Sequence, residues 1–283
     1  MGLSICCTGT EERALHLKAQ LLSLSTFKIP YPVEFIFADD SGTDTVERVL
    51  EDLTLPFPVT YIRYSTLHPW SNSPYGCPSF GLNLAIKHAK FDAILKVDPE
   101  IFWVESPFSL IPGLFHPDRV VIGHAFSLPK GDTQRILKGE PFEQLEGKIK
   151  ETPTLFLFSK RRFLLVGGYD EDFMKGVGFE TEEWLERMRL SGAQIVEFPK
   201  LRAFHLWHPL KRSFLLQHQN ERLFQQRLKE FSQGKPWVAN QDHVWGDPAA
   251  ISKLRVFNEG TGSEWGQSGH PRECLQAVGQ PRD

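Results

Sequence analysis

The sequence predicts an α/β protein built on a mostly parallel central sheet flanked by helices. Short apolar runs alternate with segments whose apolar residues recur at helical spacing, and four such units occupy residues 3–97. Alternation of this kind connects successive strands through crossover helices, which makes neighbouring strands parallel. From residue 234 onward Gly, Pro, Ser, Asn and Gln dominate, which predicts an irregular C-terminal extension.

The first half of the chain contains the clearest elements. A short apolar run is followed by the turn Thr8-Gly9-Thr10, and Thr10 lies where the N-cap of a helix is expected. The remaining pattern consists of runs of four to eight apolar residues and of segments with one apolar face. The predicted strands are residues 3–7, 33–38, 59–64 and 93–97, and the predicted helices are residues 11–24, 43–53 and 79–89, with a loop at residues 65–78.

The second half is less regular because prolines interrupt it. Residues 131–150 are polar and charged with scattered apolar side chains, a pattern that is compatible with either a helix or a long insertion. The predicted strands are residues 120–125, 154–158, 193–198 and 202–206, and the predicted helices are residues 181–190 and 211–231.

Composition and charge narrow the class of protein. Charged residues make up 24% of the chain and the net charge is −3, so the chain as a whole has no basic field for nucleic acid. No apolar run has the length of a membrane span, and the N-terminus lacks a signal-peptide pattern. Cys6 and Cys7 lie in an apolar strand and are expected to be reduced core residues. We therefore expect a cytoplasmic protein, at most peripherally associated with the inner face of a membrane.

The segment FDAILKVDPEIF contains the strongest candidate site. A buried strand is predicted to end at Asp98, and Pro99 separates this residue from Glu100. On extended backbone, residues two positions apart point to the same side, so the two carboxylates are expected to lie together. Carboxylate oxygens at the end of a core strand suit a hard divalent cation. A solvated turn is the alternative for an isolated D-P-E.

Two further turns follow strands of the same sheet. They are Thr8-Gly9-Thr10 after the first strand and Asp39-Asp40 after the second. The carboxyl ends of parallel strands meet at one edge, where α/β proteins bind ligands, so together the three turns predict a nucleotide-sized crevice with a metal at its inner end. A helix-capping turn is an equal alternative at Asp39-Asp40.

Acidic and histidine residues also cluster in the second half. Glu180, Glu182 and Glu183 open a predicted helix, where acids complement the helix dipole but one of them can also act as a general base. In FHLWHP, His205 and His208 point to opposite faces if the strand continues, so they share a metal only if the strand ends between them.

Six segments together resemble the inverting family-2 glycosyltransferases of the GT-A fold, which is Rossmann-like. They are FADDSGTD, LNLAIKHA, LKVDPEIF, VGGYDEDF, GFETEEW and FHLWHP, in the family's order and approximate spacing over roughly residues 3–230. No single segment is decisive, but the set is specific.

The resemblance implies roles for the nucleotide and metal residues. In the family, the turn after the first strand packs on uridine and the second Asp of the DD turn contacts the base, which match residues 8–10 and Asp40. The DxD motif binds ribose and metal, so Asp98 is implied at the ribose or the metal and Glu100 at the metal. A histidine after a later strand completes the metal shell, and His205 matches it.

The resemblance also implies the catalytic residues. The family's G-x-E-D base motif matches residues 178–183, with Glu183 at the base position, expected to lean toward the crevice. Glu182 is then expected to bond backbone or to shape the acceptor pocket. Lys211 and Arg212 are candidates for a loop that closes over the diphosphate, although the start of a solvated helix explains them equally.

The implied activity is that of a metal-dependent inverting glycosyltransferase. It moves a sugar from a nucleotide sugar, expected to be a UDP sugar, to a hydroxyl acceptor such as a glycan or glycolipid, as in polysaccharide biosynthesis, with Mn²⁺ or Mg²⁺ as cofactor. Residues 1–105 are expected to form the nucleotide-sugar-binding half of one domain, residues 106–233 the acceptor and catalytic half, and residues 234–283 the extension. The chain departs from the family pattern in two places: D-P-E replaces DxD, and Glu replaces the Asp base. These departures concern which donor sugar is used and leave the type of reaction unchanged.

Two alternatives stay open at the level of sequence. A nucleotidyltransferase on a related sheet also needs acids and a metal, but it normally has a basic loop after the first strand, where this chain has TGTEER. A non-catalytic module that binds a nucleotide sugar or glycan would keep the fold without turnover, and only an assay separates it from an enzyme.

Overall fold

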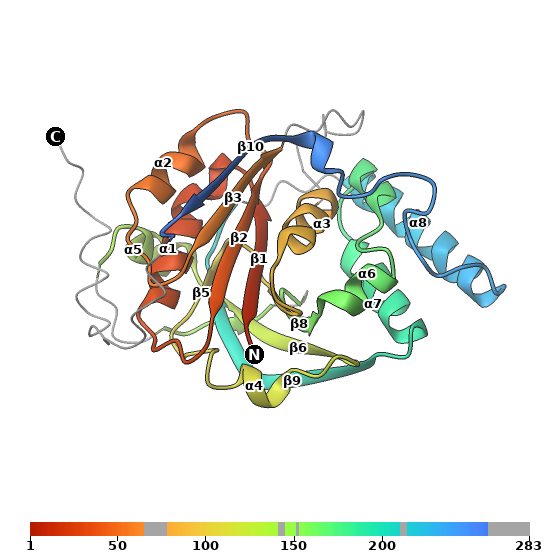
Figure 1. Cartoon of the computed structure of the whole chain (residues 1–283), viewed down its shortest axis with the longest axis horizontal. Coiled ribbons are helices and arrows are strands. Elements are labelled where there is room, and N and C mark those ends of the chain that lie inside the picture. Colours follow the sequence, from red (N-terminus) through yellow and green to blue (C-terminus); the bar gives the residue numbers. More distant parts are fainter. Residues whose placement is uncertain (65–77, 141–144, 151–152, 210–213, 260–283) are drawn as a thin grey trace.

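The computed structural model describes residues 1–64, 78–140, 145–150, 153–209 and 214–259. Figure 1 shows a central sheet with helices on both of its faces. The strands are β1 (Leu3–Gly9), β2 (Val33–Asp39), β3 (Val59–Tyr64), β4 (Ala93–Lys96), β5 (Ile101–Phe102), β6 (Arg119–Ser127), β7 (Lys148–Ile149), β8 (Leu155–Ser159), β9 (Gln194–His205) and β10 (Ile251–Phe257). The helices are α1 (Ala14–Ser25), α2 (Thr45–Glu51), α3 (Ser79–His88), α4 (Ile111–Leu114), α5 (Lys130–Leu137), α6 (Lys160–Leu165), α7 (Glu180–Leu190) and α8 (Phe214–Ser232), with 3₁₀ turns η1 (Glu11–Arg13), η2 (Glu171–Lys175) and η3 (Pro248–Ala250).

The sheet is parallel at its centre. Within the described residues its strand order is β10-β3-β2-β1-β4-β8-β6-β9-β5, with β7 paired to β6. Strands β3, β2, β1 and β4 are parallel, and Leu3 of β1 is in register with Val33 of β2 and Ala93 of β4. The carboxyl ends of β1, β2 and β4 therefore lie together. The predicted fold class is confirmed.

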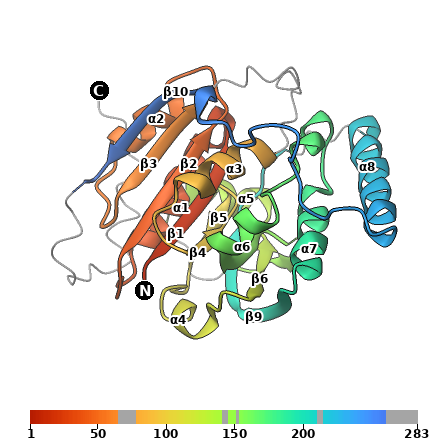
Figure 2. The same ribbon diagram turned by 45° about the vertical axis from the view of Figure 1, so that its right-hand side comes forward.

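The two faces of the sheet bury separate cores. Leu3, Ile5 and Cys7 of β1 pack with α1 and α2, whereas Cys6 between them packs with α3, α6 and α7. This alternation is the period of a strand buried on both sides. Figure 2 shows α3 and α6 in front of the central strands and α7 and α8 farther out on the same side. Cys6 and Cys7 are buried free thiols, as expected.

The second half differs from the prediction in two places. Residues 194–205 form the single strand β9, where two strands were expected, because a register shift against β6 absorbs the irregular residues between Glu197 and Arg202. Gly123 of β6 lies at this shift, and a Cβ there would meet the Leu201 carbonyl at 2.6 Å. Residues 131–150 contain most of α5 and the short strand β7, and among the described residues no helix is long and apolar enough to cross a membrane.

The C-terminal extension is more regular than predicted. Strand β10 pairs antiparallel with the edge strand β3, which places the extension beside the first half of the chain (Figure 1). The nearly buried carboxylate of Glu47 in α2 accepts hydrogen bonds from Lys253 and Arg255 of β10. Covering the edge of a sheet protects its backbone groups, so this part of the extension belongs to the fold. The polar, Gly-rich end of the sequence also predicts that a cut after about residue 265 leaves a folded protein, and that prediction concerns residues outside the described part.

We expect Phe257→Ala to lower the free energy of unfolding by about 3 kcal/mol, because truncating a buried aromatic side chain leaves a cavity. Phe257 is 9% exposed and its ring centroid lies 6.4 Å from that of Tyr61. The matched control is Val256→Ala, since Val256 is 40% exposed, and it should cost less than about 1 kcal/mol. Urea denaturation measures the free energy of unfolding of both variants. A loss in Phe257→Ala as small as that expected for Val256→Ala would show that packing of Phe257 does not stabilise the sheet.

Candidate functional site

The three predicted turns meet at one edge of the sheet, called here the carboxyl edge: the ends of β1, β2 and β4 and the turns that follow them. Gly9 is in register with Asp39, and the Asp40 amide donates to the Gly9 carbonyl at 3.0 Å. A Cβ on Gly9 would meet the Pro99 ring at 3.2 Å, so the absence of a side chain lets the first turn approach D-P-E closely. The Thr8 hydroxyl donates to the Ala38 carbonyl at 2.8 Å and ties β1 to β2.

The two aspartates after β2 have different environments. Asp39 is fully buried, and its carboxylate accepts from the Ser41 amide at 3.0 Å and from the Tyr61 hydroxyl at 2.6 Å. Burial raises the pKa of Asp39, and these hydrogen bonds oppose the shift. Asp40 is partly exposed at the carboxyl edge. Asp39 therefore shapes the turn, and Asp40 is the one accessible to a ligand.

Asp98 is paired with two lysines that the sequence analysis did not single out. The ammonium of Lys96 donates to Asp98 at 2.7 Å, and that of Lys150 lies 3.7 Å from the other carboxylate oxygen. Burial alone would raise the pKa of Asp98, but the charges of Lys96 and Lys150 hold it well below its usual value. Lys96 could have been found, because it lies two positions before Asp98 on the same strand face. Lys150 could not, because it comes from a distant loop.

Glu100, His205 and His208 form a possible metal centre. One potential ligand atom from each lies within 4.8 Å of the others. The Nε2 atom of His205 is buried without a hydrogen-bond partner, and burial together with Lys150 lowers the pKa of His205 to about 3, so its imidazole is neutral. A carboxylate with two imidazoles is a donor set for Mn²⁺ or another first-row divalent cation, so these residues fit a metal. Asp98 is not a member of this group.

His208 joins the group because β9 ends at His205. The chain then leaves the strand, and the Leu206 amide donates to the Glu100 carbonyl at 2.8 Å, which holds this segment against D-P-E. The Nε2 atom of His208 lies 3.6 Å from the Glu100 carboxylate. From the sequence, the two histidines were expected to share a metal only if the strand ends between them, and β9 does end there.

Glu180 begins α7 on a constrained turn. Gly178 and Phe179 both have positive φ, 76° and 67°, a conformation that is costly for a bulky residue and typical of functional sites. The buried Asn220 of α8 holds the turn by donating to the Gly178 carbonyl at 2.8 Å. One oxygen of Glu180 is buried without a hydrogen-bond partner. Burial raises the pKa of Glu180 to about 7, and the charges of Lys96 and Asp98 also act on it.

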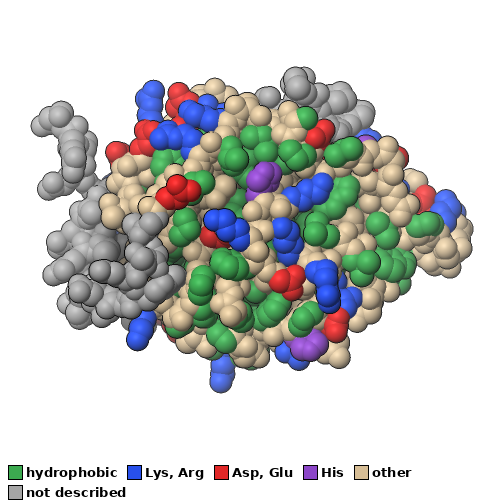
Figure 3. Space-filling view, viewed as in Figure 1, with side chains coloured by type: hydrophobic (Ala, Val, Ile, Leu, Met, Phe, Trp, Pro, Cys, Tyr) green, Lys and Arg blue, Asp and Glu red, His purple; other side chains and the backbone are tan. Residues whose placement is uncertain are grey.

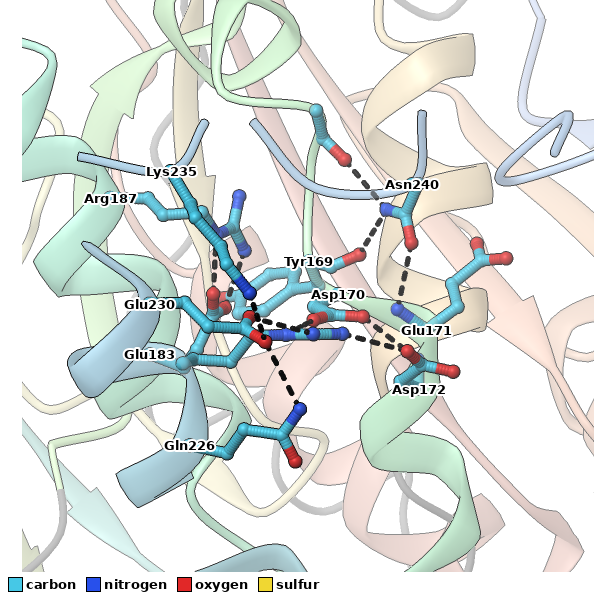
Figure 4. Close-up of polar contacts among 12 residues, drawn as sticks. Tyr169, Asp170, Glu171, Asp172, Glu183, Arg187, Gln226, Glu230, Lys235 and Asn240 are labelled. Carbon is cyan, nitrogen blue, oxygen red and sulfur yellow. Dashed lines mark hydrogen bonds and ion pairs between the residues drawn. The ribbon is translucent and has the colours of Figure 1, made fainter. Parts of the chain in front are cut away.

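Glu183 has a different orientation from the one expected. Its two oxygens accept from Nε and Nη2 of Arg187 at 2.7 and 2.6 Å, and both side chains are buried (Figure 4). Arg187 in turn donates to the carbonyls of Val166 and Gly168 at 2.6 and 2.7 Å. The expectation that Glu183 leans toward the crevice is corrected by this ion pair, since both of its oxygens are already bound. Glu182 is exposed at the start of the helix.

A second polar network anchors the C-terminal extension behind α7. Asn240 donates to the carbonyls of Gly167 and Tyr169, both at 2.7 Å, and accepts from the Glu171 amide at 3.0 Å (Figure 4). Arg227 of α8 pairs with Asp170 at 2.9 Å. These groups bind one another, so the network holds residues 167–171 in place rather than presenting free groups to a ligand.

Two expectations concern the surface around the site. Lys211 and Arg212 lie outside the described residues. On the face shown in Figure 3, Lys and Arg side chains of the described residues are interspersed with Asp and Glu, so this face has no single-sign field.

Comparison with known proteins identifies the fold. No family model and no curated protein matches the sequence. Among solved structures, TarS of S. aureus has a TM-score of 0.52 at 16% identity, covering 79% of this chain and 39% of that chain. TarS 1–349 in complex with UDP gives 0.51 at 15% identity over 83% and 73%, and in complex with UDP-GlcNAc it gives 0.50 at 16% over 74% and 59%. The chain therefore shares the GT-A-like fold of these structures and spans less than half of the first TarS chain.

Glu183→Ala should lower the free energy of unfolding by about 3–5 kcal/mol, because it leaves the buried Arg187 without its partner. The control is Glu182→Ala, an exposed position on the same helix, with an expected change within about 0.5 kcal/mol. Urea denaturation measures both. A Glu183→Ala protein as stable as the wild type would mean that this carboxylate is not held by Arg187 and is available to the crevice.

Proposed function

We propose that this chain is an inverting glycosyltransferase that moves a sugar from a nucleotide sugar to a hydroxyl acceptor. The observation that carries the proposal is made at the carboxyl edge of a GT-A-like sheet, where three candidate metal ligands converge with the first turn and D-P-E. The carboxyl group of Glu180 has a pKa raised by burial, and the negative charge of Asp98 contributes to the shift. Residues 1–105 would hold the donor and residues 106–233 the acceptor.

The donor is proposed to be a UDP sugar. Thr8, Gly9 and Thr10 form the turn on which the nucleoside would pack, Asp40 would accept from the base, and Asp98 would contact the ribose. Asp40 suits this role because Asp39 is already occupied inside the fold. TarS 1–349 was solved with UDP and with UDP-GlcNAc, which supports the same class of donor for a similar fold.

The metal is proposed to be Mn²⁺ or Mg²⁺, held by Glu100, His205 and His208. Two imidazole ligands favour Mn²⁺ over Mg²⁺, which prefers oxygen ligands. A divalent cation there would neutralise charge on the departing diphosphate. Lys96 and Lys150 add fixed positive charge beside Asp98, which favours the same developing negative charge.

Glu180 is proposed as the general base, in place of Glu183. In the reaction, the acceptor oxygen attacks the anomeric carbon, the bond from that carbon to the diphosphate oxygen breaks, and the acceptor proton moves to the Glu180 carboxylate. A carboxyl group with a pKa of about 7 is matched to this task at neutral pH. The exposed Glu182 is proposed to contact the acceptor, a glycan or glycolipid.

Calorimetry with UDP tests the donor and metal sites. We expect Mn²⁺ to strengthen UDP binding and Glu100→Ala to remove that gain, because one of three ligands is lost. Asp40→Ala should weaken binding by about 1–3 kcal/mol, the cost of leaving a hydrogen-bond partner unpaired. Asp52→Ala, an exposed aspartate at the other end of α2, is the control. Equal affinity in EDTA would exclude the metal role, and unchanged binding by a folded Asp40→Ala protein would exclude the base contact.

The pH dependence of sugar transfer tests the base. Only ionised Glu180 accepts a proton, so turnover should rise with pH and level off above about 7. Glu180→Gln should reduce turnover by roughly 10²–10⁴-fold without weakening UDP binding, and this rise should disappear. Glu182→Gln, the matched neighbour, should keep the pH profile.

A panel of nucleotide sugars, with nucleotide release as readout, supplies the substrate for these measurements. A pH profile unchanged in Glu180→Gln would exclude Glu180. A folded wild-type protein that binds UDP but turns over no donor would favour the non-catalytic binding module.

A further inference from the structure

Arg13 connects the first turn to the metal ligands. It ends η1, and its amide donates to the Thr10 carbonyl at 2.9 Å. Its guanidinium donates from Nε to the Glu100 carboxylate and from Nη2 to Nδ1 of His208 at 2.9 Å. One side chain, 17% exposed, therefore contacts two of the three residues of the possible metal centre.

The contact with His208 determines which ring nitrogen carries the proton. Nδ1 accepts from Arg13, so in the neutral ring the proton lies on Nε2, the nitrogen that faces Glu100 at 3.6 Å. A metal ligand needs an unprotonated nitrogen there. If Arg13 moves away, Nδ1 of His208 can carry the proton instead. Its N–H can then donate to the Pro209 carbonyl oxygen, which lies 3.1 Å from Nδ1. Arg13 and a metal on Nε2 therefore exclude each other at His208.

The same exclusion applies to Glu100. The two carboxylates of D-P-E already face cations of the chain, Asp98 with Lys96 and Lys150, and Glu100 with Arg13. A divalent cation on Glu100 would lie against the guanidinium, and the two positive charges repel at such short range. Binding of the metal to this oxygen requires Arg13 to move.

We infer that Arg13 is an exchange cation: it contacts two of the metal ligands when no metal is bound, and it transfers to the donor diphosphate when the metal binds. This inference rests on the proposed function. A diphosphate attached to a nucleoside at Thr8–Thr10 and ligated by a metal at Glu100 would lie between the two places that Arg13 already contacts. Arginine suits the role because its planar group binds carboxylate and phosphate equally well, through paired hydrogen bonds.

The first measurement is Mn²⁺ binding without nucleotide, by calorimetry or from the electron paramagnetic resonance signal of free Mn²⁺. Arg13→Gln should bind Mn²⁺ about tenfold more tightly than the wild type or better, because the competing charge-assisted contact is gone. Arg13→Lys keeps a charge at Glu100 but cannot also reach His208, so its affinity should be intermediate. Adding His205→Ala to Arg13→Gln should remove the gain.

The second measurement is UDP binding at saturating Mn²⁺. Here Arg13→Gln should bind about tenfold more weakly than the wild type, because the diphosphate has lost its guanidinium. The charge control is Arg161→Gln: its amide donates to Asp92, at the amino end of β4, so the same charge is removed far from the carboxyl edge. Both affinities should be unchanged in that variant, and melting temperatures verify folding.

The outcomes separate the inference from the proposed function. A folded Arg13→Gln protein that binds Mn²⁺ no better than the wild type overturns the exchange. Tighter Mn²⁺ binding with unchanged UDP binding overturns the transfer to the diphosphate. If neither protein binds Mn²⁺, both the exchange and the metal role are overturned, while UDP binding in EDTA still reports on the donor site.

Discussion

The parallel pairing of β1 with β2 and β4 is the constraint on which the candidate site depends. Because Leu3 is in register with Val33 and Ala93, the three strands run side by side and end at the same edge of the sheet. The turns that follow them then meet, and Gly9 lets the first turn pack closely on Pro99. Hydrophobic layers on both faces hold this register, since a slip of one residue would exchange the side chains that face α1 with those that face α3. The geometry of the site is thus a consequence of the core.

Charge compensation is the second feature of the site. Taking carboxylates out of water is unfavourable unless each has a partner, and Asp98 and Glu100 have cations of the chain as partners. The protein therefore does not need a metal to tolerate D-P-E, and any metal must replace a contact that exists. If the proposed exchange takes place, such a site would favour a cation that arrives together with a negatively charged donor, because the released guanidinium would then find a new partner.

The start of α7 shows how one short acidic segment is divided between two tasks. Glu183 lies one helical turn inside the helix and pairs with Arg187 at i+4, which stabilises the helix against the core. Glu180 lies at the end of the turn with positive φ, and one of its carboxyl oxygens is buried without a hydrogen-bond partner. Burial raises the pKa of this carboxyl group, and the negative charge of Asp98 adds to the shift. Asn220 of α8 holds this turn through the Gly178 carbonyl, so a helix far along the chain still positions the candidate base.

The alternation of apolar strands and amphipathic helices determined the fold class, and D-P-E, the Thr-Gly-Thr turn and Asp39-Asp40 determined where the site would lie, because parallel strands bring their carboxyl ends together. His208 and Glu180 were noticed in the sequence, but the roles now proposed for them could not be read from it. The role of His208 depends on where β9 ends, and that of Glu180 on which side of α7 each carboxylate faces. Packing decides both. Strand β10 was missed because its alternating pattern gains a partner only at the edge of β3. Arg13 contacts Glu100, which lies 87 positions away in the chain, and His208, which lies 195 positions away. A local sequence pattern cannot predict contacts over such separations.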